Sequence, residues 1–235
     1  MNLSAQQIRM LKVVVFVACL GPLFLLLWKA VHILPWISNI GFIASGADRW
    51  NLGANPIEVI TRSTGKATLL FLLITLTITP ARRLLELPWL VRFRRMLGLF
   101  AFFYASLHFL TYIWLDKFFD VHEMLVDIAK RKFITIGFTA FVLLIPLAIT
   151  STKGWIRRLG GKRWARLHQL TYVCAVLGVF HFWWLVKLDV RRPEKYAAVL
   201  AVLLAYRIVF WMMERAREAR ERAAIANSST TIPQR

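Results

Sequence analysis

The chain has 235 residues, of which 58% are hydrophobic, and a formal net charge of +19. Average soluble domains are less apolar, and the apolar residues here form blocks of about 17–20, enough to cross a hydrocarbon core of about 30 Å. Because the basic residues are scattered over several short connections, they exclude a nucleic-acid-binding surface and are typical of membrane-protein loops. The sequence therefore predicts an all-α integral membrane protein.

The first apolar run, residues 13–31, is too long for the core of a signal peptide, and no small-residue cleavage site follows it. We therefore predict that it is a retained first span. The two cysteines, Cys19 and Cys174, lie inside apolar segments and form no CxxC pair. They are predicted to be small buried hydrophobes, and no zinc or iron–sulfur site can be built from them.

Six spans are predicted, forming one transmembrane bundle. A connection over residues 35–66 follows the first span and contains turns and a short interfacial helix. The second span is extended backwards by a helix over residues 57–65 and is expected to stop before Pro80. After the sixth span, a charged tail continues the helix until residues 227–229. In order, the spans cover residues 13–31, 67–79, 96–115, 133–149, 166–187 and 197–213.

The charges of the connections predict the orientation. The 82–95 connection holds five basic residues and one acid, and the 153–166 connection holds six basic residues and no acid. Eight of the twelve acids lie in the alternate connections. Since positive loops stay inside, both termini are expected in the cytoplasm. The predicted organisation is a cytoplasmic N-terminus (1–12), a membrane domain (13–213) and a charged cytoplasmic tail (214–235).

Three histidines lie within or beside apolar spans, where ionisable side chains are costly and usually functional. His108 is 13 residues beyond Arg95, and His181 is 15 residues beyond Arg166. At 1.5 Å per residue, each lies roughly 20 Å from the cytoplasmic edge, in the outer half of the membrane. Two imidazoles at one depth on parallel helices suit a bis-histidine heme. The alternative is a polar bridge between helices.

His168 begins the fifth span and has no histidine at its own depth on the third span, where Met96 is the only conceivable, weak ligand. Snorkelling to the interface or bonding to a backbone carbonyl is its alternative role. His32 and His122 lie at a span end and in a loop, so structural roles are expected. Arg207, inside the sixth span, is consistent with three roles: a heme propionate partner, a flavin phosphate partner or a snorkelling cation.

Several motifs together resemble the MsrQ family, a heme-binding membrane subunit of a bacterial protein-methionine-sulfoxide reductase system within the ferric-reductase-like transmembrane group. The resemblance covers nearly the whole chain. One departure falls at residues 130–135, where the family often has proline at the third position, and it affects only local loop shape. The matching stretches are residues 52–58, 77–80 with Arg82, 95–99, 103–104 with His108 and Tyr112, 148–151, 159–164, 167–168 with Tyr172, and 181–182 with Trp184.

The resemblance implies a b-type heme protein of the bacterial inner membrane that also binds FMN. It assigns the heme ligands to His108, His168 and His181. It further implies that electrons come from the quinone pool or a cytosolic flavin reductase. They pass to a periplasmic molybdopterin subunit, on which methionine sulfoxide in oxidised periplasmic proteins is reduced and the proteins are thereby repaired.

The residues add independent limits. No GxGxxG motif follows a predicted strand, and no room for a flavin and nicotinamide domain is expected after the sixth span. Electrons are therefore expected to come from a quinol or a separate protein. The outward 35–66 connection and the acid-rich connection before residue 133 are expected docking surfaces for the partner. Two other functions stay open: a stand-alone transmembrane ferric reductase, and a transporter with a histidine proton relay.

Overall fold

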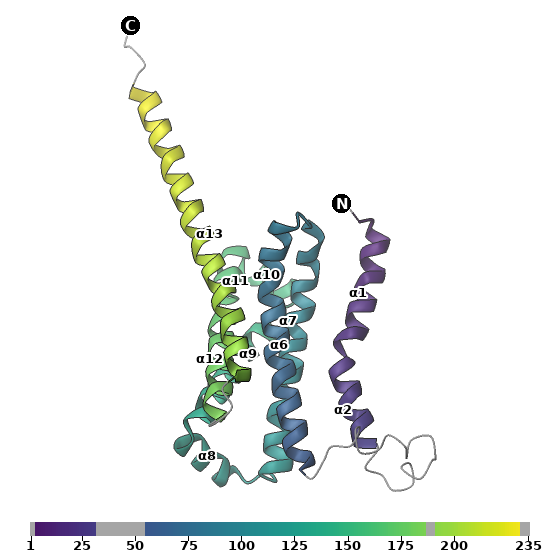
Figure 1. Ribbon diagram of the computed structural model, residues 1–235. Coiled ribbons are helices and arrows are strands. Elements are labelled where there is room, and N and C mark those ends of the chain that lie inside the picture. The colour runs from purple at the N-terminus through teal and green to yellow at the C-terminus, as the bar shows by residue number, and fades with distance from the viewer. Residues whose placement is uncertain (1–2, 32–54, 187–190, 231–235) are drawn as a thin grey trace.

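The computed structural model describes residues 3–31, 55–186 and 191–230, and every regular element in these ranges is helical. Figure 1 shows the long helices side by side, with the start of α1 and the end of α13 at one end and α8 at the other. The elements are α1 (Ala5–Cys19), α2 (Gly21–Val31), α6 (Pro56–Leu84), η1 (Pro88–Leu90), α7 (Val91–Leu110), η2 (Thr111–Asp116), α8 (Val121–Lys130), α9 (Lys132–Ile149), α10 (Lys153–Leu159), α11 (Gly161–Leu167), α12 (Leu170–Leu185) and α13 (Arg191–Thr230).

Five helical stretches of the described residues are long and apolar enough to cross a membrane, so this is a multi-pass membrane protein. They coincide with five of the six predicted spans. The remaining one, predicted over residues 166–187, contains α12, whose 16 residues fall short of the roughly 20 that a span needs. The count of six spans therefore stays a prediction. The five stretches are Ala5–Ala30, Pro56–Leu84, Pro88–Asp116, Lys132–Ile149 and Arg191–Ala223.

The central helix is α6, which packs on α7 along much of its length and also contacts α2, α12 and α13. One apolar core lies between α6, α7 and α9, and includes the fully buried Ala101 and Tyr104. A second core joins α6 to α12 and α13 around Leu76 and Ala175. Residues such as Val14 on α1 and Val202 on α13 are instead exposed. Apolar surfaces of this kind suit contact with lipid tails.

The first predicted span is two helices, because its backbone ladder is interrupted just before Pro22. The buried Tyr104 hydroxyl donates a hydrogen bond to the Cys19 carbonyl (2.8 Å) and accepts one from the Leu23 N–H (3.2 Å). In a continuous helix these two backbone groups would pair with each other. A hydroxyl from α7 thus satisfies two backbone groups at the break between α1 and α2.

The prediction that the second span stops before Pro80 is wrong, since α6 continues through Pro80 to Leu84. Proline has no N–H, so the Leu76 carbonyl one turn earlier loses its helical partner. Arg207 of α13 supplies it: a guanidinium nitrogen donates to the Leu76 carbonyl at 3.1 Å. The same guanidinium lies over the Tyr172 ring of α12, 4.7 Å from its centroid. Arg207 therefore has a structural role in joining three helices.

Arg207→Leu is expected to destabilise the protein by about 1–3 kcal/mol, because the Leu76 carbonyl is left without a partner in a dry environment. In a Pro80→Ala background, Arg207→Leu should cost less stability, because the N–H of alanine at residue 80 can donate to the Leu76 carbonyl. Thermal unfolding in detergent, followed by circular dichroism, measures both effects. Arg215→Leu, an exposed position on the same helix, is the control. An equal loss from Arg207→Leu in the two backgrounds would contradict the pairing.

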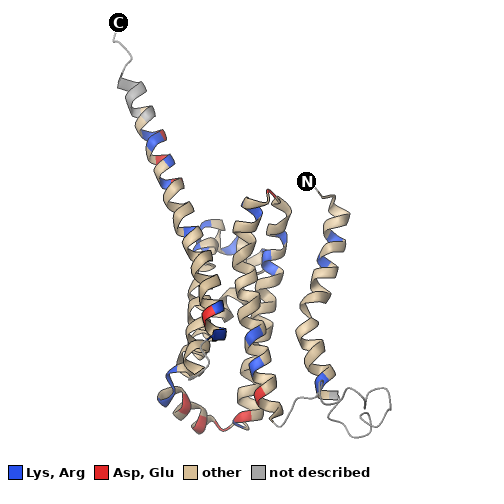
Figure 2. Ribbon diagram, in the orientation of Figure 1, with Lys and Arg blue, Asp and Glu red and all other residues tan. Residues whose placement is uncertain are grey.

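The two ends of the bundle differ in charge. Figure 2 shows acidic residues on α8 and at the start of α6, whereas α10 and α11 at the other end carry basic residues. The predicted basic loops are themselves largely helical: residues 82–95 contain η1, and residues 153–166 contain α10 and α11. Gly160, with φ +74°, separates α10 from α11 in a conformation that favours glycine. The break predicted at residues 227–229 is wrong, because α13 runs to Thr230.

Candidate functional site: a histidine pair between two helix pairs

His108 lies near the C-terminal end of α7 and faces α6. Its Nδ1 is 2.9 Å from the Thr61 carbonyl oxygen and 3.4 Å from the Thr64 hydroxyl. A carbonyl oxygen only accepts, so Nδ1 carries the proton and donates to it. The other ring nitrogen, Nε2, then keeps its lone pair. His108 is therefore in the tautomer that can bind a metal through Nε2.

His181 repeats this arrangement on a second pair of helices, α9 and α12. It lies near the C-terminal end of α12, and its Nδ1 is 2.7 Å from the carbonyl oxygen of Phe133 on α9. The same reasoning places its proton on Nδ1 and leaves Nε2 with a lone pair. The helices α9 and α12 pack on each other much as α6 and α7 do. Each histidine is thus fixed by a backbone carbonyl of its own partner helix.

The two rings meet where the two helix pairs meet. Their centroids are 6.0 Å apart and their planes are at 79°. This confirms the expectation that His108 and His181 lie at one depth. Since a metal–imidazole bond is about 2 Å long, two imidazoles on opposite sides of one iron place their ring centres about 6 Å apart. The spacing and the two Nε2 lone pairs fit a bis-imidazole heme iron.

An aromatic ring and a π-helical segment lie beside the pair. The Phe133 ring centroid is 6.1 Å from that of His181. Immediately after His108, α7 passes into the π-helical segment η2, where the Thr111 hydroxyl donates to the His108 carbonyl. Single π-helical turns of this kind are frequent at functional sites. The Thr111 hydroxyl also accepts a hydrogen bond from the Thr61 hydroxyl (3.3 Å), which ties η2 to α6 beside the ring.

His168 lies elsewhere, at the C-terminal cap of α11. Its ring stacks on Trp164 (centroids 4.0 Å apart), and its Nε2 is 3.1 Å from the Thr150 hydroxyl oxygen. That hydroxyl donates to the Pro146 carbonyl at 2.6 Å, so His168 Nε2 is the donor and Thr150 the acceptor. Trp164 donates to the Thr150 carbonyl (2.9 Å). The contacts of His168 in the described chain therefore join α11 to the end of α9.

The remaining predicted residues have other surroundings. Met96 packs against the first apolar core. His122 is exposed on α8. His32 lies outside the described residues, as does most of the 35–66 connection. The described part of the chain contains no group of three or more His, Cys, Asp or Glu residues that could hold a metal ion. The free cysteines Cys19 and Cys174 are buried, as predicted.

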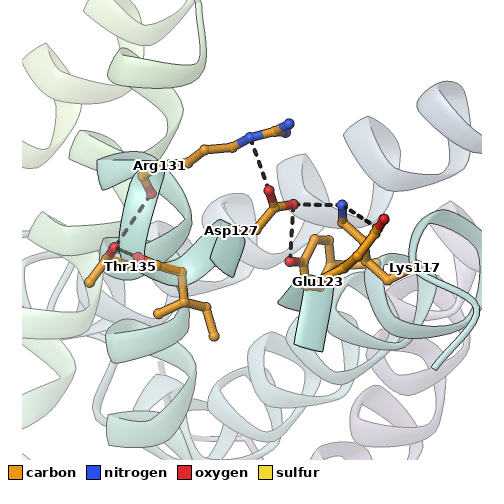
Figure 3. Close-up of polar contacts among 7 residues, drawn as sticks. Lys117, Glu123, Asp127, Arg131 and Thr135 are labelled. Atoms are coloured by element: carbon orange, nitrogen blue, oxygen red, sulfur yellow. Dashed lines mark hydrogen bonds and ion pairs between the residues drawn. The ribbon is translucent and has the colours of Figure 1, made fainter. Parts of the chain in front are cut away.

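At the end of the bundle where α8 lies, the connection from η2 to α9 is held by an ionic cluster that sequence reasoning missed. Figure 3 shows Asp127 between Lys117 and Arg131, at 2.8 and 3.2 Å. Lys117 also reaches Glu123 at 3.3 Å. The Lys117 and Asp127 side chains are only 13% and 11% exposed. The hydrogen bond from the Lys117 ammonium lowers the pKa of Asp127, and the same bond raises the pKa of Lys117.

The apolar helices and the adjacent His108 and His181 define the chain as a helical, multi-pass membrane protein with a pair of buried histidines. The family described as "Ferric reductase like transmembrane component" matches residues 63–179, which include His108 and His168 and end just before His181. The chain also aligns over most of its length with named relatives, and it belongs to the family of protein-methionine-sulfoxide reductase heme-binding subunits, MsrQ.

Three relatives, each named "Protein-methionine-sulfoxide reductase heme-binding subunit MsrQ", show the extent of the similarity. The protein of Herminiimonas arsenicoxydans is 55% identical, covering 83% of this chain and 90% of the relative. That of Ralstonia nicotianae is 52% identical, with coverages of 80% and 87%. That of Rhodospirillum rubrum is 49% identical, with coverages of 86% and 88%.

Proposed function

We propose that this protein is a b-type heme electron-transfer subunit of a methionine-sulfoxide reductase system. The observation that carries the proposal is the pair His108 and His181, two imidazoles with free Nε2 lone pairs and ring centroids 6.0 Å apart. The names of the relatives, which are heme-binding subunits, support it. When bound there, heme would supply one-electron oxidation and reduction of its iron.

The residues of the chain have three tasks in this function. His108 and His181 would hold the iron through Nε2, while the carbonyls of Thr61 and Phe133 keep both Nδ1 protons in place. The apolar packing of α6, α7, α9 and α12 would keep water from a bound heme, and the exclusion of water influences the reduction potential of a heme iron. Electron transfer requires neither a nucleophile nor an acid–base pair from this chain. The reduction of methionine sulfoxide is therefore assigned to the partner subunit.

The direction of transfer follows from the proposed orientation. The basic end of the bundle, with both termini, is placed in the cytoplasm, and the end with α8 in the periplasm. His108 and His181 then lie in the outer half, near a periplasmic molybdopterin partner. The acid-rich connection containing α8 is a docking candidate within the described residues. The electron donor is proposed to be a quinol or a cytosolic flavin reductase, and FMN binding enters the proposal through the resemblance alone.

His168 is proposed to contribute a separate heme site near the basic end, again through the resemblance. His168→Ala should then lower the heme-to-protein ratio of the purified protein, while the spectrum of the His108–His181 heme stays. The ratio comes from a pyridine hemochromogen assay combined with iron analysis. An unchanged ratio would instead leave His168 with the structural role that its contacts to Trp164 and Thr150 describe.

The visible spectrum of the purified protein tests the proposed function itself. A reduced-minus-oxidised difference spectrum with Soret and alpha bands is expected. A protein without these bands would refute the heme assignment and favour a histidine proton relay. The match to the ferric-reductase-like family favours a second candidate, a stand-alone ferric reductase. Reduction of ferric iron chelates by the purified protein, without any partner, would support that candidate.

A further inference from the structure

The same three parts recur at each histidine of the pair: the imidazole, the backbone carbonyl that accepts its hydrogen bond, and a glycine four residues after that carbonyl. On α6, the carbonyl that accepts from His108 belongs to Thr61, and Gly65 follows four residues later. On α9, the carbonyl that accepts from His181 belongs to Phe133, and Gly137 follows four residues later. In an α-helix the residue at i+4 lies directly above the carbonyl at i. Each imidazole therefore lies against a glycine while it donates to the carbonyl one turn away.

The space at these two glycines is taken by the rings themselves. A Cβ atom at Gly137 would be 2.6 Å from Nδ1 and 2.8 Å from Cε1 of His181. A Cβ atom at Gly65 would be 3.1 Å from Cε1 and 3.2 Å from Nδ1 of His108. Distances under 3.0 Å are essentially never tolerated for a Cβ atom, so something must shift at Gly137. At Gly65 a displacement of a few tenths of an ångström would relieve the contact.

The ring is the part that has to shift. The glycines and the accepting carbonyls belong to the same helical turns, so they cannot separate without breaking the helix. An imidazole pushed away by a methyl group moves away from its carbonyl and toward the opposite ring. Other helical glycines differ: a Cβ atom at Gly98 would meet only the Thr75 methyl, at 3.8 Å. The close fit at Gly65 and Gly137 is specific to the histidine pair.

We propose that Gly65 and Gly137 are positioning residues that set the orientation of the two iron ligands. This inference rests on the proposed function, because it requires an iron between His108 and His181. The two helix pairs contribute equivalent devices, α6 with α7 and α9 with α12. Each consists of a carbonyl that fixes the Nδ1 proton and a glycine that lets the ring approach. Together the two devices would present two imidazoles, with ring planes 79° apart, to a single iron.

The 79° angle between the ring planes gives this inference a spectroscopic readout. Near-perpendicular axial imidazoles give low-spin ferric heme a highly anisotropic electron paramagnetic resonance signal, whereas near-parallel imidazoles give an ordinary rhombic one. A methyl group at residue 137 would displace the His181 ring and change this angle. A merely structural role of Gly137 would leave the signal unchanged, since a change in helix stability alone does not turn the ring.

The experiment compares Gly137→Ala, Gly65→Ala and the control Gly98→Ala in the full-length protein purified in detergent. The wild type and Gly98→Ala should share the highly anisotropic signal. Gly137→Ala should alter it and weaken heme retention by about 10- to 100-fold, the usual cost of disturbing the partners of a metal ligand. Gly65→Ala should alter the signal with a smaller loss of heme, because its contacts are longer.

The outcomes distinguish the proposed heme binding from the positioning role of Gly65 and Gly137. A wild type without heme would refute the proposed function. A wild type with heme, and both glycine variants with an unchanged signal and heme content, would overturn the positioning role alone. Loss of helix stability cannot imitate the expected result, since alanine favours a helix over glycine by about 1 kcal/mol. If Gly137→Ala fails to accumulate, the milder Gly65→Ala decides the question through its signal.

Discussion

His181→Ala and His108→Ala are each expected to reduce the heme content of the purified protein by at least about tenfold, because each would remove one of the two proposed ligands of the iron. The bis-imidazole signal should vanish in both variants. The optical difference spectrum and the heme-to-protein ratio measure the loss. The effect should be alike at the two positions, since each ring is held by one carbonyl and lies 6.0 Å from the other.

His122→Ala is the matched control, since His122 is exposed on α8 and has no part in the pair. It should leave the heme content unchanged. Far-ultraviolet circular dichroism of each variant checks that the helices are intact. Retention of the full bis-imidazole signal in both His108→Ala and His181→Ala would show that the iron ligands lie elsewhere. Loss in only one of them would mean that the other is a packing residue.

Asp127→Asn is expected to destabilise the protein by about 2 kcal/mol, because it leaves Lys117 short of its closest partner in a largely buried position. The α8 connection should loosen with it, since Arg131 loses the same carboxylate. Thermal unfolding and limited proteolysis of the connection measure the two effects. Glu123→Gln is the control: its side chain is 61% exposed, and exposed pairs contribute about 0–1 kcal/mol.

The pH dependence of stability follows from the shifted pKa values of Asp127 and Lys117. The pKa of Asp127 is lowered chiefly by the hydrogen bond from Lys117, so its contribution is present above the ordinary Asp value of about 4 and is lost as the pH falls through the lowered pKa. The pKa of Lys117 is raised, so its contribution is lost only as the pH rises above its ordinary value of about 10.4. Unfolding temperatures of the wild type should therefore fall more steeply with acid than those of Asp127→Asn. Parallel pH profiles would contradict this assignment.

The positions of the membrane helices and the common depth of His108 and His181 could be predicted from the sequence. Both depend on local quantities, namely the length of an apolar run and the fixed rise of a helix. The ends of the helices were less predictable. Pro80 favours the end of a helix, yet α6 continues through it, and the Leu76 carbonyl that it leaves without a helical N–H accepts from Arg207, 131 residues further along the chain. At the break before Pro22, the group that pairs with the Cys19 carbonyl is likewise distant in the chain, namely the Tyr104 hydroxyl of α7.

By itself, the sequence determined the class of the protein: a helical membrane protein with two histidines at one depth, because apolar length and charge act along the chain without reference to other helices. Tertiary structure alone decided how the histidines can work. The carbonyls that fix their protons belong to residues whose side chains give no signal, and the glycines that admit the rings are recognisable only once the helices are packed. Packing also gave His168 its contacts to Trp164 and Thr150, because ring stacking and hydrogen bonds depend on neighbours that spacing along the chain does not specify.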